Sequence, residues 1–490
     1  MIKRYLLVMA LLVLSVTAYA DVKTARLFTN GMVIQREAKA PVWGWAEPGE
    51  QVEVSGSWGS KSAVKADKDG RWMLQLQTPK AGGPHSISIK GNNTITLNDV
   101  LSGDVWLCTG QSNMAWPVEK TNNAESAIKT ANFPQIRRFS NRIMPVMEVP
   151  EDLDARSEWL SCSPETAGKF SATAFYTMRE LQKEIDVPIG IVMAASGGTF
   201  IESYTSAEFL KDDIIAKRMI ERAKQKAAES KSTQKARVDK NYPGVLYRGN
   251  IAPLKTFALK GVIWYQGENN AFELQRAEYY RVQLRNLINC LRQQWGNPEL
   301  PFYFVQLPNF KETTDDPNAK TSGWPIIRES FLDVAKSTPN TGMVVTIDLG
   351  EIKNIHPTNK TDVGKRMASL VLNKTYGKNT PTSPLYIKSE IEGDKVIIHF
   401  DYAGSGLMAK GDKLEYFAIA GDDKKLLWAD AVIEKRNGKD VVVVSSPQIK
   451  KPASVRYAWA MNPNTCNLYS KEGLPASPFR TDTWQLSKKK

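Results

Sequence analysis

Short apolar runs alternate with long amphipathic segments through the middle of the 490-residue chain. Four amphipathic helices are expected there, over 169–185, 276–295, 325–336 and 361–373. The apolar runs are expected to be buried strands, over 104–109, 188–195, 261–266, 301–307 and 343–348. Strands that alternate with helices pack as a mostly parallel sheet covered on both faces. The sequence therefore predicts an α/β domain with three α/β/α layers over residues 99–375.

Patterns typical of β structure lie on both sides of this domain. Short alternating runs such as 40–46 and 52–55 are separated by turn signals, among them Pro48-Gly49. Beyond residue 376 the β pattern returns, at 395–400 and 440–444. We therefore expect an N-terminal β-sandwich domain over 21–98 and a C-terminal β-sandwich domain over 376–490.

The first twenty residues have the pattern of a secretory signal peptide. Lys3 and Arg4 precede an apolar stretch from Tyr5 to Val16, and the small-residue motif Ala18-Tyr19-Ala20 follows. That stretch is too short to span a bilayer, and no later segment approaches the length of a membrane span. We expect cleavage near Ala20 and export of the remaining chain to the periplasm or to the outside of the cell.

Basic residues exceed acidic ones, and the net charge is +13. Part of the excess lies between Lys217 and Lys240, within a basic helical excursion that we expect near 208–240. A nucleic-acid-binding segment would interleave aromatic side chains with the basic ones, and residues 217–240 contain no aromatic side chain. A solvated helix is therefore the preferred interpretation, and nucleic acid is not an expected partner.

The four cysteines lie far apart, without the spacing of a metal site: Cys108, Cys162, Cys290 and Cys466. No metal and no organic cofactor is expected. An oxidising compartment permits disulfides, but the sequence does not choose a pairing. The oligomeric state also stays open.

Ser112 and His356 are the candidate nucleophile and base. Ser112 follows the first predicted strand, in Gly110-Gln111-Ser112-Asn113-Met114. A serine hydroxyl needs an adjacent base, which is most often histidine. Of the three histidines, His85 and His399 lie in strand-like runs of the flanking domains, whereas His356 lies in a loop after the fifth strand. The pair predicts a serine hydrolase.

Polar and glycine-rich segments follow four of the predicted strands. Sites in open α/β sheets form beyond the carboxyl ends of the strands. Gly197 and Gly198 follow the second strand, where a glycine amide can donate to an oxyanion. Gln266, Asn269 and Asn270 follow the third and offer an amide side chain for the same purpose. Each segment alone could be an ordinary turn between a strand and a helix. Because all of them are expected at one edge of the sheet, together they indicate an active site.

Position 114 is Met, so the standard Gly-x-Ser-x-Gly nucleophile elbow is not met. The chain instead resembles the sialate O-acetylesterase family, a branch of the SGNH (GDSL-like) hydrolases. Ordered motifs along nearly the whole chain carry the resemblance: 31–36, Val42-Trp43-Gly44-Trp45-Ala46, 103–106, 110–114, 197–199, Trp264-Tyr265-Gln266-Gly267-Glu268, Ile355-His356-Pro357-Thr358-Asn359-Lys360 and 473–482.

The resemblance implies an SGNH-type domain in which Ser112 is the nucleophile and His356 the base. It further implies a carbohydrate esterase that releases acetate from O-acetylated sialic acids. The Ser112 amide, with Gly197 or Gly198 and an amide side chain, would form the oxyanion hole. The SGNH pattern Gly-x-Asn points to Asn269, whereas the more regular residues of this branch look like Gln266 and Asn270. Candidates for substrate binding are Gln111, Glu268 and Arg248, whose guanidinium suits a sugar carboxylate unless it is a surface arginine.

The acid of a catalytic triad has no clear position. SGNH enzymes often carry Asp three residues before the histidine, and relatives of this branch carry it two before, where this chain has Lys353 and Asn354. Asp348 and Glu351 are nearby carboxylates that could orient His356. The alternatives for that role are Asn354, or a main-chain carbonyl in a Ser-His dyad. Two other functions stay open: an esterase of the same fold acting on acetylxylan or another glycan, and a non-catalytic glycan-binding protein.

Overall fold

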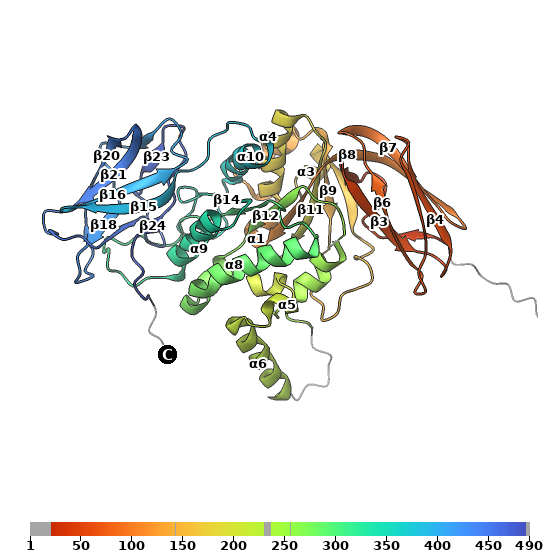
Figure 1. Ribbon diagram of the computed structural model, residues 1–490, viewed down its shortest axis with the longest axis horizontal. Coiled ribbons are helices and arrows are strands. Elements are labelled where there is room, and N and C mark those ends of the chain that lie inside the picture. The colour runs from red at the N-terminus through yellow and green to blue at the C-terminus, as the bar shows by residue number, and fades with distance from the viewer. Residues whose placement is uncertain (1–20, 143, 230–236, 255, 487–490) are drawn as a thin grey trace, which may run out of the picture.

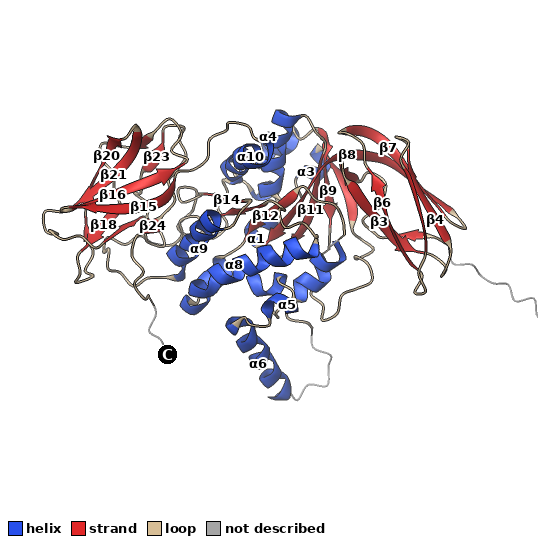
Figure 2. Cartoon of the chain, viewed as in Figure 1, coloured by secondary structure: helices blue, strands red, loops and turns tan. Residues whose placement is uncertain are grey.

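The computed structural model describes residues 21–142, 144–229, 237–254 and 256–486 (Figure 1). The predicted signal peptide, residues 1–20, lies outside them. Strand-rich regions lie at both ends of the molecule, and the helices gather in the middle (Figure 2). Among the described residues, no helix is both long and apolar enough to cross a bilayer.

The N-terminal region packs two sheets face to face. Alternate residues such as Val52 and Val54, or Leu74 and Leu76, point into a shared core. One sheet has the order β1-β3-β6, from Lys23–Thr24, Lys39–Trp45 and Arg71–Gln77. The other contains β2 (Val33–Gln35), β4 (Gln51–Gly56), β5 (Lys61–Lys65), β7 (Gly82–Lys90) and the start of β8.

Strand β8 (Thr94–Gly110) belongs to two domains at once. Its first part pairs with β7 and β2, and its last part pairs with β11 (Ile189–Ala195) and β12 (Gly261–Tyr265). The expected boundary at 98/99 therefore falls inside one continuous strand. This strand carries the chain from the N-terminal sandwich directly to Ser112.

The central sheet has the order β10-β9-β11-β8-β12-β13-β14. Neighbours from β9 to β14 run parallel, and β10 (Glu158–Cys162) is antiparallel to β9 (Phe133–Ser140). All five predicted strands of this domain are present. The last, β14 (Thr341–Val344), is shorter than the predicted 343–348, because its neighbour β13 (Phe302–Val305) ends before Pro308 and leaves residues 345–347 without a strand partner.

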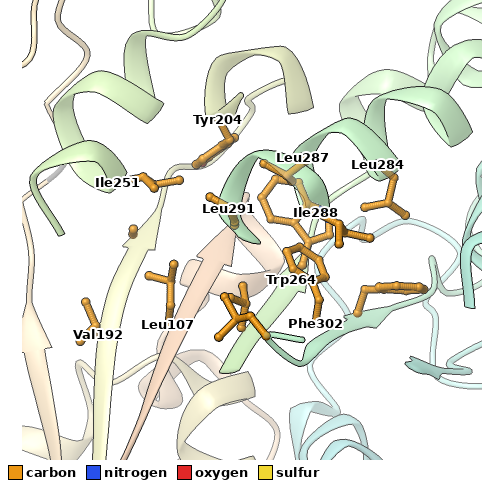
Figure 3. Close-up of a cluster of buried hydrophobic side chains, with 14 of the residues drawn as sticks. Leu107, Val192, Tyr204, Ile251, Trp264, Leu284, Leu287, Ile288, Leu291 and Phe302 are labelled. Carbon is orange, nitrogen blue, oxygen red and sulfur yellow. The ribbon is translucent and has the colours of Figure 1, made fainter. Parts of the chain in front are cut away.

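Helices cover both faces of this sheet, and the alternation of side chains along the strands explains how. Trp106, Cys108 and Ile263 belong to a buried cluster with α4 (Ala172–Ile185) and α10 (Lys360–Tyr376). Leu107 and Trp264 pack on the other face with Leu287 and Leu291 of α8 (Leu274–Gln294), beside α9 (Gly323–Ser337) (Figure 3). The predicted three-layer α/β class is confirmed.

The basic excursion contains α5 (Ala207–Leu210) and α6 (Ile214–Glu229), which projects from the body of the molecule (Figure 1). Residues 230–236 of the excursion lie outside the described chain. All four cysteines are described and free: Cys108, Cys162, Cys290 and Cys466.

The C-terminal region is a second β-sandwich, as predicted. The stacked rings of Tyr386 and Phe479, 4.5 Å apart, join its two larger sheets. One sheet has the order β15-β16-β21-β20, from Leu385–Glu392, Lys395–Asp401, Lys439–Ser445 and Asp430–Arg436. The other has the order β19-β18-β22-β24, from Leu427–Trp428, Phe417–Ala420, Ser454–Tyr457 and Phe479–Arg480, and β17 (Leu407–Ala409) pairs with β23 (Leu468–Ser470).

Candidate active site

Ser112 begins the short helix α1 (Ser112–Ala115), directly after β8. The turn requires Gly110, which has φ +134°, because a Cβ there would lie 2.2 Å from the carbonyl oxygen of Tyr265. The amide of Gln111 donates to that same carbonyl at 2.9 Å, which holds the turn against β12. The Ser112 side chain is thereby lifted out of the sheet and stays half-buried.

His356 lies in the loop between β14 and α10, and its Nε2 is 2.7 Å from Ser112 Oγ. The Asn354 side chain holds this loop, because its Oδ1 accepts from the His356 amide at 3.0 Å and its Nδ2 donates to the His356 carbonyl at 2.8 Å. Trp116 stacks on the imidazole, with ring centroids 4.4 Å apart and planes inclined by 15°. The histidine is thus oriented by a ring stack and by backbone contacts.

The candidate acids have other partners. Asp348 pairs with Arg366 at 2.7 Å and accepts from the Tyr469 hydroxyl at 3.2 Å. Glu351 accepts from the Thr358 amide at 2.6 Å and from Asn354 Nδ2 at 2.9 Å. Burial opposes its ionisation, yet the hydrogen bonds from Thr358 and Asn354 together lower the pKa of Glu351. Within the described chain, the imidazole makes its side-chain hydrogen bond to Ser112 and to no carboxylate.

A buried polar network connects the serine turn to the histidine loop. Asn113 is fully buried, and its Nδ2 donates to Glu268 Oε1 and to the Ile355 carbonyl at 3.0 Å. Lys360 Nζ, also fully buried, donates to Asn113 Oδ1 and to the Pro357 carbonyl, both at 2.7 Å. Each catalytic candidate therefore has an immediate chain neighbour bound in this network.

Burial and neighbouring charge set the electrostatics of the site. Burial lowers the pKa of Lys360 to about 7 and raises the pKa of Glu268 above its usual value. Burial, followed by the positive charges of Lys360 and Lys120, lowers the pKa of His356. A histidine with a lowered pKa is neutral at neutral pH, which is the form that accepts a proton.

The second and third strand ends also reach the serine. A Cβ added to Gly197 would lie 3.3 Å from Ser112 Cβ, so the backbone after β11 closes on the nucleophile. Asn269 is partly exposed, and its Nδ2 donates to the Gly198 carbonyl at 3.1 Å. One N–H of that amide therefore remains for another acceptor.

The other two amide candidates are bound inside the protein. Gln266 is fully buried, and its Nε2 donates to the Thr199 carbonyl at 3.0 Å and to Asn270 Oδ1 at 2.8 Å. Asn270 is fully buried and donates to Glu202 Oε2 at 3.0 Å. These contacts tie the end of β12 to the loop after β11.

The three candidates for substrate binding differ in accessibility. Gln111 and Glu268 are buried, and Glu268 faces Asn113. Arg248 is half-buried, and its guanidinium donates to the main-chain carbonyls of Val146 at 3.2 Å and Pro243 at 3.1 Å. The carboxylate of Glu268 and the guanidinium of Arg248 are thus both engaged by groups of the protein.

Four residues of the site were not assigned a role from the sequence: Asn113, Trp116, Lys240 and Lys360. Asn113 and Lys360 lie in the same motifs as Ser112 and His356, and that adjacency was the available signal. Trp116 is four residues beyond the serine, and Lys240 Nζ, from the basic excursion, donates to the Gly197 carbonyl. Only the folded chain shows which groups of the site these four side chains contact.

Comparison with known proteins identifies the family of the chain. Residues 102–373, more than half of the chain and including both Ser112 and His356, match the family model described as carbohydrate esterase, sialic acid-specific acetylesterase. The sialate O-acetylesterase of Mus musculus is 30% identical, over 93% of this chain and 93% of that protein. The sialate O-acetylesterase of Homo sapiens is also 30% identical, over 93% and 91%.

A solved structure extends the similarity to the whole fold. The crystal structure of a carbohydrate acetylesterase from Xanthomonas citri is 36% identical, with a TM-score of 0.84 over 95% of this chain and 100% of that one. The similarity thus covers nearly the whole chain. The chain belongs to the carbohydrate esterase family of sialic acid-specific acetylesterases.

Proposed function

We propose that this protein hydrolyses O-acetyl esters of sialic acids and releases acetate through an acyl-enzyme on Ser112. The observation that carries the proposal is the 2.7 Å contact between Ser112 Oγ and His356 Nε2 at the carboxyl edge of the central sheet. Membership of the carbohydrate esterase family supports the reaction class. The names of the sialate O-acetylesterase relatives support sialic acid as the parent sugar.

In this mechanism His356 Nε2 takes the proton of Ser112 as Oγ attacks the acetyl carbonyl. The oxyanion receives hydrogen bonds from the Ser112 amide, from the amide of Gly197 or Gly198, and from Asn269 Nδ2. His356 then protonates the departing sugar oxygen. Water, activated by the same imidazole, attacks the acetyl carbonyl and releases acetate with Ser112 restored.

We infer a Ser-His dyad, because Asp348 and Glu351 have other partners. The stack on Trp116 and the two Asn354 contacts take over the orienting role that a carboxylate has in a triad. The lowered pKa of His356 supports its role as the base of the dyad, because it keeps Nε2 free to accept a proton.

Two lysines beside the dyad support an anionic sugar. Lys120 Nζ lies 5.3 Å from the ring centre of Trp116, and exposed Lys240 reaches the Gly197 carbonyl. Their positive charge would favour the carboxylate of a sialic acid. The alternative substrate is a neutral acetylated glycan such as acetylxylan, because the Xanthomonas citri neighbour is described as a carbohydrate acetylesterase without a named sugar.

The test is acetate release from O-acetylated sialic acid and from acetylxylan under identical conditions. Release from the sialic acid in clear preference to acetylxylan supports the proposal. The reverse preference would assign the neutral glycan instead. Release from neither substrate, together with retained glycan binding, would favour the non-catalytic alternative.

Replacement of Asn269 by alanine is expected to lower kcat by about 10²- to 10³-fold, the usual cost of one oxyanion donor. The fold should be preserved, because the side chain is partly exposed. The matched control is Asn270→Ala, which breaks the buried contact with Glu202 and should lower the thermal midpoint. A normal kcat in Asn269→Ala would remove this residue from the oxyanion hole.

Activity should extend below the ordinary pKa of histidine, because burial and neighbouring lysines lower the pKa of His356. Lys120→Gln removes one positive charge, so the pKa of His356 should rise and the acid limb of kcat/KM should move to higher pH. Salt should reduce the difference between the two proteins, since Lys120 is exposed. Lys68→Gln, at an exposed position of the N-terminal domain, is the control, and an equal shift in both variants would refute this electrostatic effect.

A further inference from the structure

A cavity of about 540 Å³ lies between the N-terminal sandwich and the catalytic domain. One wall comes from β3 and β6, with Trp43, Trp45, Arg71 and Met73. The facing wall includes Glu151 and Pro253. None of the described segments that carry the dyad or its oxyanion donors lines this cavity, so it is separate from the candidate active site.

The wall formed by β3 and β6 departs from the usual pattern of a sandwich. Val42 points inward and is fully buried, so Trp43 and Trp45 point to the outer face, opposite Met73 and Arg71 of β6. An outer face normally carries polar side chains. This face instead presents two indole rings and Met73, which is 49% exposed.

Contacts at the domain junction account for only part of this apolar face. Trp43 packs edge-on against Phe28 at 4.7 Å, and Phe28 contacts Phe257 of the catalytic domain at 5.9 Å. Trp45 has no such ring partner among the described residues. The indole N–H groups of Trp43 and Trp45 likewise have no hydrogen-bond acceptor among the residues that the structure describes. Trp45 therefore lines the cavity with an indole that has neither an aromatic partner nor a hydrogen-bond acceptor among the described residues.

We propose that this cavity is a second carbohydrate site, which binds a neutral sugar residue of the glycan whose ester is cleaved. A pyranose has an apolar C–H face and a hydroxyl edge, which match an indole face surrounded by polar groups. Asp67, Arg71 and Glu151 supply those polar groups. The two carboxylates outnumber the single guanidinium, so the site disfavours the carboxylate of a sialic acid and favours an uncharged sugar.

The consequence for function concerns extended substrates. A glycan held at this cavity and at Ser112 by the same chain gains effective concentration at the dyad, provided that the glycan spans both sites. A small acetyl ester gains nothing from the second site. This consequence for extended substrates rests on the proposed carbohydrate esterase function. Binding of the sugar at the cavity does not, and it is measured without catalysis.

The test is calorimetric titration of the full-length protein with lactose and xylobiose as neutral probes, and with free sialic acid as the anionic comparison. Trp45→Ala should weaken binding of a neutral probe by about tenfold or more, the effect expected of a tryptophan that dominates a contact. The matched control is Trp428→Ala, on an exposed tryptophan of the C-terminal sandwich, which should bind normally. If Trp45→Ala does not fold, sugar binding is measured instead with Glu151→Gln and Arg71→Gln, which change exposed residues that line the cavity.

Equal binding by wild type and by the cavity variants would overturn the proposal, as would binding of neither neutral probe at millimolar concentration. Concentration-dependent dimerisation abolished by Trp45→Ala would assign the face to a second copy of the chain instead. Hydrolysis of 4-nitrophenyl acetate separates this inference from the proposed function. Trp45→Ala should hydrolyse this ester at the wild-type rate. If the esterase proposal is wrong, the wild-type protein will not hydrolyse the ester but will still bind the saccharide.

Discussion

Ser112→Ala is expected to lower acetate release by about 10⁴-fold or more, since the acyl-enzyme then has no oxygen on which to form. His356→Ala should cause a loss of similar size, because the hydroxyl at 2.7 Å loses its base. The double variant should be little worse than either single one, as expected of two residues that act as a unit. Rates are measured as kcat/KM on O-acetylated sialic acid.

Two control variants keep this result specific. His399→Ala removes a histidine from β16 of the C-terminal sandwich, and Ser126→Ala removes an exposed serine from α2 (Ala124–Lys129). Both should retain wild-type rates. A serine-directed phosphonate probe should label wild type and fail to label Ser112→Ala. Wild-type acetate release by Ser112→Ala would exclude the mechanism and require another nucleophile.

The strand ends were predictable because burial and chain direction are local properties of the sequence. The apolar runs that became β8, β11 and β12 each stop at glycine or polar residues, so Ser112, Gly197 and Asn269 were expected at one sheet edge. Asn354 stands where the family pattern has Asp, which the sequence shows directly. What its amide does, bonding both backbone groups of His356, depends on the loop conformation and is not encoded in spacing.

Side-chain direction was the part that sequence could not supply. Glu268 follows β12 at the sheet edge, which made it a candidate for substrate binding, yet its carboxylate is buried against Asn113. Lys360 begins α10, where a lysine usually lies in solvent, but here the helix start packs beneath the serine turn. Trp45 belongs to an alternating run and to a family motif, but its exposure depends on how β3 faces the catalytic domain.

Lys360→Met is the substitution with the second large expected effect. It removes the cation that binds both Asn113 and the Pro357 carbonyl, and it leaves Glu268 buried without a compensating charge. Leaving a buried acceptor such as Asn113 Oδ1 without its donor costs about 1–3 kcal/mol. We therefore expect a lower free energy of unfolding in urea. A lower kcat should accompany it, because the serine turn and the histidine loop lose the contact through Lys360 and keep the one from Asn113 to the Ile355 carbonyl.

Lys365→Met is the matched control, since Lys365 lies on the same helix, its side chain is 58% exposed, and its one ion pair within the described ranges is with Asp362. Its stability should change by less than about 0.5 kcal/mol. Adding Glu268→Gln to Lys360→Met removes the stranded carboxylate, so the double variant should regain part of the lost stability. It should not regain kcat, because Asn113 still lacks its contact to the histidine loop through Lys360. A double variant that is less stable than Lys360→Met would show that the two charges do not compensate one another. A normal kcat in Lys360→Met would show that Lys360 does not position His356, and would leave that role to Asn354 and Trp116.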